Sequence, residues 1–145
     1  MVDFNIIPYQ SAGPISIGMT KEEVRNVMSE KPNDYHNIRG AYTDCFEESN
    51  IFVYYTNADG ICEAIEFCEP TIAMFNGKPI NGVKFIEAMK WLERFDSETI
   101  YEKYVGLTSY KLGIGIYAPK YDEVENSDEN VEAVIVFKKG YYDKD

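Results

Sequence analysis

His36 and Cys45 are the residues of this chain whose types could support nucleophilic catalysis. His36 is the only histidine among 145 residues, so any mechanism that moves a proton through an imidazole must use it. A Cys45 thiol activated by His36 would form a nucleophile and base pair, but the spacing matches no catalytic signature. Because the stretch NDYHNIRG is polar and loop-like, we interpret His36 as an exposed loop residue and expect no enzymatic activity.

Carboxylates and glycines could support other chemistry, namely hydrolysis, metal binding or phosphate binding. The adjacent Glu22 and Glu23 are explained by the partial positive charge at a helix N-terminus. Residues 122–129, DEVENSDE, carry many oxygen ligands but lack the glycine bend and the distal glutamate of a calcium loop. The stretch NGKPING lacks the glycine spacing and the hydroxyl of a phosphate loop. We therefore expect neither a metal nor a cofactor.

The charge and the tyrosine content indicate a protein partner instead. A formal charge of −11 disfavours nucleic acids and anionic membranes, which attract lysine and arginine, and favours a basic protein. Twelve tyrosines add large side chains that suit recognition surfaces, although tyrosine is also a good strand former. Where two tyrosines are adjacent, as in VYYT and GYYD, one of each pair must face away from the core of a strand.

These observations predict a partner-binding surface made of carboxylates and tyrosine. Residues 41–70 hold seven acids and no lysine or arginine, and residues 121–145 hold eight acids against three lysines. The first region is expected to supply the main contacts, and the acidic segment 122–129 is the second choice. The candidate contact residues are Asp44, Glu47, Glu48, Tyr54, Asp59, Glu63 and Glu66, followed by Asp122, Glu123 and Glu125.

Two helices are expected to position these residues. Thr20 and Glu23 form a capping-box pattern, which predicts the start of a short helix that ends before Pro32. The second helix is expected over residues 83–95, where apolar residues form a broad stripe. Trp91 lies in that stripe, so we expect it in the core.

Strands are predicted from aromatic and β-branched residues between turn formers. The turn TNADG at 56–60 is typical of a hairpin. Strict alternation in the strand that follows would place Glu63 on the apolar face, so we expect a bulge or a sheet edge near Gly60. The expected strands are residues 3–9 as an edge strand, 41–47, 51–56, 61–68, 109–119 and 131–142, with 75–82 as a loop.

The length suits a single domain spanning residues 1–145. The segments 13–70 and 75–142 follow a similar plan, in which a helix and a hairpin lead to EAIEF in one half and EAVIVF in the other. We therefore expect an α+β fold in which two helix-plus-antiparallel-hairpin units share one antiparallel sheet with the helices on one face.

The cellular location is expected to be the cytoplasm. No stretch is apolar over the length that spans a bilayer, and MVDFNIIPYQ lacks the pattern of a secretion signal. Cys45, Cys62 and Cys68 are an odd number and do not resemble a disulfide framework, which fits a reducing compartment.

The sequence also resembles two groups of proteins that work by binding. The entry IGMTKEEV, the hairpin with GICEAIEF and the repetition of this plan resemble the SmpA/OmlA/BamE outer-membrane lipoprotein family and the related β-lactamase-inhibitor-like fold. The second half, LGIGIYAPKY followed by VEAVIVFKKGYYD, is similar to small cytoplasmic immunity proteins of bacterial contact-dependent and polymorphic toxin systems. That resemblance implies a protein that binds and silences a toxin domain, often a nuclease.

Two hypotheses of function follow. The leading one is an immunity protein that neutralises a basic toxin domain, with carboxylates standing where the phosphates of the toxin's substrate would bind. The alternative is a non-catalytic scaffold or assembly module related to BamE-type envelope lipoproteins. Binding to a basic toxin should weaken steeply as salt rises, whereas scaffold binding to a neutral surface should depend little on salt.

Overall fold

The computed structural model describes residues 2–36, 42–57 and 59–142, and in these residues the chain is mostly β-structure. Thirteen strands form two sheets, of eight and five strands, and the two helices are short. The expected α+β fold with one shared sheet is therefore wrong. A second sheet exists because residues 71–75, to which the sequence assigns no element, pair with the predicted edge strand on one side and with part of the predicted loop on the other.

The larger sheet has eight antiparallel strands and contains most of the predicted contact residues. Its strand order is β10-β11-β12-β13-β7-β6-β5-β4. The strands predicted around residues 41–68, 109–119 and 131–142 all belong to it. Its members are β4 (Asn33–His36), β5 (Tyr42–Phe46), β6 (Ile51–Tyr55), β7 (Cys62–Phe67), β10 (Ile100–Glu102), β11 (Gly106–Ser109), β12 (Ile114–Tyr117) and β13 (Ala133–Phe137).

The smaller sheet has five strands in the order β3-β2-β1-β8-β9. Its members are β1 (Val2–Ile7), β2 (Ser11–Ala12), β3 (Ile15–Ser16), β8 (Thr71–Phe75) and β9 (Lys78–Pro79). The segment predicted as an edge strand lies inside the sheet, because β1 pairs with β2 on one side and, in parallel, with β8 on the other. The predicted loop at 75–82 is instead the turn and second strand of the β8–β9 hairpin. Strands of two residues are too short to show any alternation in the sequence.

The helices are α1 (Lys21–Val27) and α2 (Phe85–Glu93), close to where the sequence predicts them. The capping box is confirmed, because the Thr20 side chain accepts a hydrogen bond from the Glu23 backbone N–H and the Glu23 side chain accepts one from Thr20. Helix α2 buries a narrower stripe than predicted, made of Phe85, Ala88 and Leu92.

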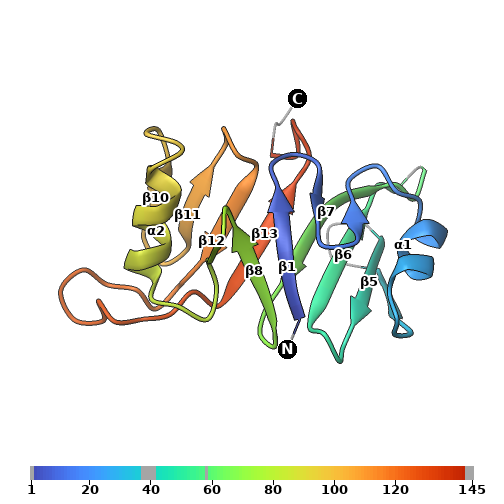
Figure 1. Cartoon of the computed structure of the whole chain (residues 1–145), viewed down its shortest axis with the longest axis horizontal. Coiled ribbons are helices and arrows are strands. Elements are labelled where there is room, and N and C mark those ends of the chain that lie inside the picture. Colours follow the sequence, from blue (N-terminus) through green and yellow to red (C-terminus); the bar gives the residue numbers. More distant parts are fainter. Residues whose placement is uncertain (1, 37–41, 58, 143–145) are drawn as a thin grey trace.

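The two sheets are stacked, and the core lies between them. Figure 1 shows the five-stranded sheet, with α1 beside one end and α2 beside the other, lying over one face of the eight-stranded sheet. We call this the core face and the opposite one the outer face. The rings of Phe4 and Phe67 join the layers, with centroids 5.9 Å apart. In β6, Ile51, Val53 and Tyr55 are fully buried on the core face, whereas Tyr54 alternates to the outer face.

The order of elements repeats along the chain. A strand, one or two short strands, a helix and a four-stranded meander occur first as β1 to β7 and again as β8 to β13. The halves meet twice, at the antiparallel β7–β13 pair and at the parallel β1–β8 pair. Because one meeting is antiparallel and the other parallel, no single twofold axis relates the halves.

Within the described residues, neither helix has the length and apolar character needed to cross a membrane.

Candidate functional site

The outer face of the eight-stranded sheet is hollowed into a groove with a cavity volume of about 840 Å³. The groove crosses β6, β7, β13, β12 and β11, so residues far apart in the sequence line it together. Gly115 lies at its floor opposite Ile135, and a Cβ added at Gly115 would come within 2.9 Å of the Ile135 side chain. We call this hollow the Tyr54 groove.

Tyrosines and carboxylates dominate the polar lining of the Tyr54 groove. Three residues of the predicted surface meet there, namely Tyr54, Glu63 and Glu66. The tyrosines that line it are Tyr54, Tyr117, Tyr141 and Tyr142. Between them, Ala133 and Ile135 of β13 and residues of β11 and β12 such as Leu107 and Ile116 supply apolar lining. The groove thus combines aromatic walls, an apolar lining and two carboxylates.

Tyr54 and Glu66 form the polar centre of the groove. They lie on the neighbouring strands β6 and β7, and the Tyr54 hydroxyl donates a hydrogen bond to the Glu66 carboxylate. Burial raises the pKa of Tyr54 well above its usual value, and the hydrogen bond to Glu66 and the charge of Glu66 raise it further. Tyr54 therefore stays protonated and holds the Glu66 carboxylate in place as a donor.

Glu63 enters the groove because of the β-bulge that the sequence predicts near Gly60. Tyr54 is paired with Ala64, but the next residue of β6, Tyr55, is paired with Cys62, so Glu63 is the extra residue. Cys62 is buried on the core side, while the Glu63 carboxylate lies 3.5 Å from the Lys138 ammonium group. The bulge thus keeps a carboxylate out of the core and directs it to the groove.

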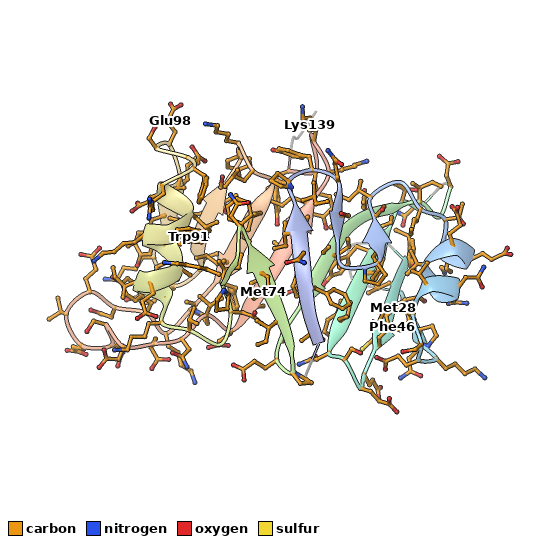
Figure 2. The ribbon with its side chains drawn as sticks, viewed as in Figure 1. Met28, Phe46, Met74, Trp91, Glu98 and Lys139 are labelled. Atoms are coloured by element: carbon orange, nitrogen blue, oxygen red, sulfur yellow. The ribbon has the colours of Figure 1, made fainter. Side chains whose placement is uncertain are left out.

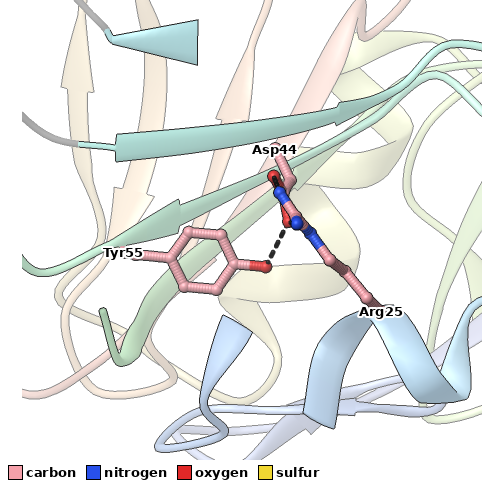
Figure 3. A network of polar contacts seen from close by, with 3 residues as sticks. All are labelled: Arg25, Asp44 and Tyr55. Atoms are coloured by element: carbon pink, nitrogen blue, oxygen red, sulfur yellow. Dashed lines mark hydrogen bonds and ion pairs between the residues drawn. The ribbon is translucent and has the colours of Figure 1, made fainter. Parts of the chain in front are cut away.

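Asp44, in contrast, is a structural residue of the core face (Figure 3). Its carboxylate is fully buried and receives two hydrogen bonds from the Arg25 guanidinium, at 2.7 and 3.0 Å. The Tyr55 hydroxyl donates a third at 2.9 Å. The prediction of Asp44 as a contact residue is corrected for this reason. Residues 41–70 contain no lysine or arginine, so the charge of Asp44 is balanced by Arg25 from α1.

The remaining predicted contacts are spread over the molecule. Glu47 and Glu48 are exposed at the β5–β6 turn, and Asp59 is exposed at the β6–β7 turn, so β6 separates them. Asp59 is the nearer to the groove, because Thr56 and Asn57 of its turn line one end. The Glu30 carboxylate accepts backbone hydrogen bonds from Glu48 and Ser49, which orders the other turn.

The acidic segment 122–129 lies in the long β12–β13 connection, near α2 and far from α1 along the long axis of the molecule (Figure 1). Asp122 is partly exposed, and Glu123 and Glu125 are exposed. The Asp122 side chain accepts hydrogen bonds from the backbone N–H groups of Val124 and Glu125, and these bonds lower the pKa of Asp122. This loop therefore presents a second acidic surface, separate from the Tyr54 groove.

Three groove tyrosines were absent from the predicted contact residues. Tyr141 and Tyr142 are the adjacent pair in GYYD, of which the sequence predicts that one faces away from the core. They follow β13, and only the fold brings them to the groove. Tyr117 ends β12 and is exposed. No local signal links these tyrosines to Tyr54, because the sheet order that joins them is a long-range property.

The residues considered for catalysis do not form an evident site in the described part of the chain. His36 lies in β4 rather than in a loop, paired with Tyr42, while Cys45 is paired with Asn33. Cys45 therefore lies three residues along β5 from Tyr42, the residue that pairs with His36. The His36 side chain is outside the described residues, and Cys45 is buried. Among the described residues, no group of three histidine, cysteine, aspartate or glutamate side chains could hold a metal ion.

Trp91 packs against the core, as expected, but it is not fully buried. Its side chain is half-buried and lines a second hollow, between α2 and β9. Figure 2 shows Trp91 on α2, in the layer that covers the core face.

No protein-family model matches the chain, and searches of curated proteins and of solved structures found no match. The arguments about function below therefore depend on the residues of this chain.

Proposed function

We propose that this chain is a cytoplasmic immunity protein that binds the basic domain of a cognate toxin, a nuclease, through the Tyr54 groove. The observation that carries the proposal is the meeting of four tyrosines with Glu63 and Glu66 in one open groove. Tyrosine and carboxylate together are the lining that an arginine or lysine side chain prefers. The ring faces attract a cation, and the carboxylate accepts charged hydrogen bonds.

The groove can accept such a side chain without rearranging its polar centre. Tyr54 already holds Glu66, so the carboxylate is positioned before a partner arrives. Ile135 and Ala133 supply apolar contact for the aliphatic stem of the entering side chain. Arginine fits best because its planar guanidinium can stack on tyrosine while it donates to a carboxylate.

The overall charge supports the same kind of partner. A formal charge of −11 attracts a basic domain over long range and speeds its encounter with the groove. The basic surface with which a nuclease binds phosphates is the surface that such a charge attracts. Cys62 and Cys68 form no disulfide among the described residues, which supports a reducing compartment such as the cytoplasm.

The proposal predicts that the adjacent upstream gene encodes a large secreted protein that ends in a basic domain, and the test uses this domain together with the full chain. Calorimetry should show tight binding, and the complex should lose the toxin's nuclease activity. Glu66→Gln should weaken binding by about tenfold or more, because it removes the carboxylate at the polar centre of the groove. Glu98→Gln is the matched control, since Glu98 is exposed on the turn between α2 and β10 and should leave affinity unchanged.

Salt dependence tests the electrostatic part of the proposal separately. The affinity of the wild-type protein should fall between about 50 mM and about 500 mM salt, because the screening length shortens over that range. Equal affinity of Glu66→Gln and the wild type would exclude the Tyr54 groove as the contact. An affinity that is independent of salt would instead fit a scaffold that binds a neutral surface.

A further inference from the structure

A basic hollow lies between α2 and β9, in an otherwise acidic protein. Its cavity volume is about 510 Å³, and its charged lining consists of Lys78, Lys90 and Arg94 with a single acid, Glu87. The chain as a whole has 14 basic residues against 25 acidic ones, so three cations around one carboxylate are a local reversal of charge. We call this site the Trp91 hollow, because the indole ring of Trp91 forms its wall.

The wall of the hollow is held in place before any ligand binds. The Trp91 indole N–H donates a hydrogen bond of 2.7 Å to the Phe75 carbonyl oxygen. The Phe95 ring packs against the Trp91 ring in a T-shaped arrangement with a centroid distance of 5.1 Å, and it packs against the Phe75 ring at the same distance. A ring fixed on two sides is a preorganised surface, so binding against it costs little conformational entropy.

The cations gather around this ring. The Lys78 ammonium group lies 4.5 Å from the centroid of the Trp91 ring, and the Arg94 guanidinium carbon lies 5.3 Å from it. Both distances are within the range of a cation–π contact. Lys78 comes from β9 and Arg94 from the end of α2, so the two sides of the hollow are both positive.

These cations are not neutralised within the described part of the chain. The described residues place Arg25, Lys84 and Lys138 in ion pairs, but Lys78, Lys90 and Arg94 form none. Lys90 and Arg94 are also one helical turn apart, a spacing at which like charges destabilise a helix. An anion bound in the hollow would relieve this repulsion.

We propose that the Trp91 hollow binds a short acidic peptide segment of a partner protein, with carboxylates on the three cations and an apolar side chain against the indole ring. The cations are spread over two elements, and Lys90 and Arg94 are about 6 Å apart along the helix axis. Such spacing suits several carboxylates better than one phosphate, which binds best where donors converge on a point. Pro79 and Val83 supply apolar contacts beside Trp91.

The charge of the whole chain further favours a short peptide over a long polyanion. Nucleic acid would bring many phosphates near a protein of charge −11, whereas a short segment meets only the local positive surface. At physiological salt the screening length is about 8 Å, so the three cations beside a short segment affect its binding more than the acids farther away. The proposal does not depend on the Tyr54 groove, which lies on the opposite side of the eight-stranded sheet.

Trp91 is the only tryptophan, so its fluorescence reports on the hollow directly. The full chain is titrated with the hexapeptide Glu-Asp-Leu-Glu-Asp-Leu, blocked at both ends, and with its amide counterpart Gln-Asn-Leu-Gln-Asn-Leu. The acidic peptide should produce a saturable change in Trp91 emission, and the amide peptide should not. Calorimetry of the same titrations detects binding that leaves the emission unchanged.

Charge variants decide whether the cations bind the peptide. Lys78→Gln with Arg94→Gln should lower the affinity by about tenfold or more, because two charged contacts are lost. Lys103→Gln with Lys120→Gln removes the same formal charge from exposed positions elsewhere and should have little effect. Thermal unfolding midpoints of both double variants, compared with the wild type, check that the fold is kept.

Three outcomes would overturn the proposal. One is the absence of saturable binding of the acidic peptide in both fluorescence and calorimetry. The second is an equal affinity of the acidic peptide for the Lys78→Gln, Arg94→Gln variant and the wild type. The third is saturation by inorganic phosphate at lower concentration than by the peptide, which would assign the hollow to phosphate. None of these measurements uses the toxin, so their failure is distinct from failure of the proposed function.

Discussion

Asp44 and Glu66 lie two strands apart in the same sheet and serve different purposes, because their side chains face opposite sides of it. Asp44 faces the core, where Arg25 and Tyr55 satisfy its carboxylate. Glu66 faces the outer groove, where Tyr54 holds it at a surface a partner can reach. The face of the sheet, rather than the residue type, decides which acid can take part in binding.

The first prediction concerns the Arg25–Asp44 pair. Arg25→Leu should lower the free energy of unfolding by about 3 kcal/mol, because it leaves a charged carboxylate buried without its cation. Arg94→Leu is the control, since Arg94 is exposed just after the last residue of α2 and forms no ion pair with the described residues, so its loss should cost less than about 1 kcal/mol. Urea unfolding measures both values. Equal losses for the two variants would contradict the structural role of the pair.

The second prediction concerns Asp96, which is buried at the end of the α2 region. Burial raises the pKa of Asp96, but the hydrogen bonds from the Ser109 hydroxyl and the Glu98 backbone N–H outweigh it and lower the pKa below 3.8. A lowered pKa means that the folded state prefers the charged form. Its stabilisation is therefore complete above pH 3.8 and is lost as the pH falls through the folded-state pKa.

Asp96→Asn should show this dependence as a difference from the wild type. The variant should be less stable by about 1 to 3 kcal/mol at neutral pH, because hydrogen bonds to a charged group are lost. The difference in stability between the variant and the wild type should narrow as the pH falls below 3.8 toward the folded-state pKa of Asp96. Urea midpoints at about pH 6 and about pH 2.5 test it. If the difference in stability stays constant with pH, the charge of Asp96 is not what stabilises the wild type relative to the variant.

At the scale of elements, short local signals position the first helix. Helix α1 has seven residues and buries Val24 alone, so its own packing contributes little and its start depends on the capping box. The same helix carries Arg25, so the start of α1 also determines where the guanidinium meets Asp44. A local motif thus supports a long-range contact.

The third prediction tests this cap. Thr20→Ala should lower the free energy of unfolding by about 1 kcal/mol, because the Glu23 backbone N–H loses its acceptor. Thr20→Ser keeps the hydroxyl and should retain most of the stability. Thermal or urea unfolding of the two variants gives the comparison. If serine failed to restore stability, the methyl group of Thr20 rather than the cap would be responsible.

Elements with strong local signals were predicted well, and those without them were missed. The hairpin at β6–β7 has its turn residues and its alternation, and the bulge at Glu63 followed from one residue that broke the pattern. Strand β8 has no such signal, because its buried residues Thr71, Ala73 and Phe75 are mixed in polarity and size. Its strand character comes from pairing with β1, which is distant in sequence.

At the scale of the whole molecule, the two stacked sheets separate surfaces of different character. The Tyr54 groove lies on the outer face and carries carboxylates, while the Trp91 hollow lies in the covering layer and carries cations. Both sites depend on the packing of the two layers. The covering layer contains β9 and α2, which form the Trp91 hollow, and it packs on the core face of the sheet that carries the Tyr54 groove. The rings of Phe4 in β1 and Phe67 in β7 are in contact between the two layers.

The fourth prediction tests the contact between Phe4 and Phe67. Phe4→Ala should lower the free energy of unfolding by about 3 to 5 kcal/mol, because it leaves a cavity between the sheets. Phe52→Ala is the control, since Phe52 is half-buried on the outer face and should cost clearly less. Both values come from denaturant unfolding followed by circular dichroism. Similar losses would mean that Phe4 is not a main contact between the layers.

The amino-acid sequence was sufficient for features that depend on near neighbours. These are the cap at Thr20, the hairpin turn, the irregularity at Glu63 and the exposure of one tyrosine in VYYT, all of which involve residues a few positions apart. The helices and strands must then pack together to bury their apolar surface, but the same local patterns are compatible with many tertiary arrangements. The pairing of β1 with β8, the second sheet and the inward position of Asp44 arise only when distant segments meet. The Tyr54 groove belongs to this second class, because its tyrosines come from three separate parts of the chain and share a surface only through the order of the strands.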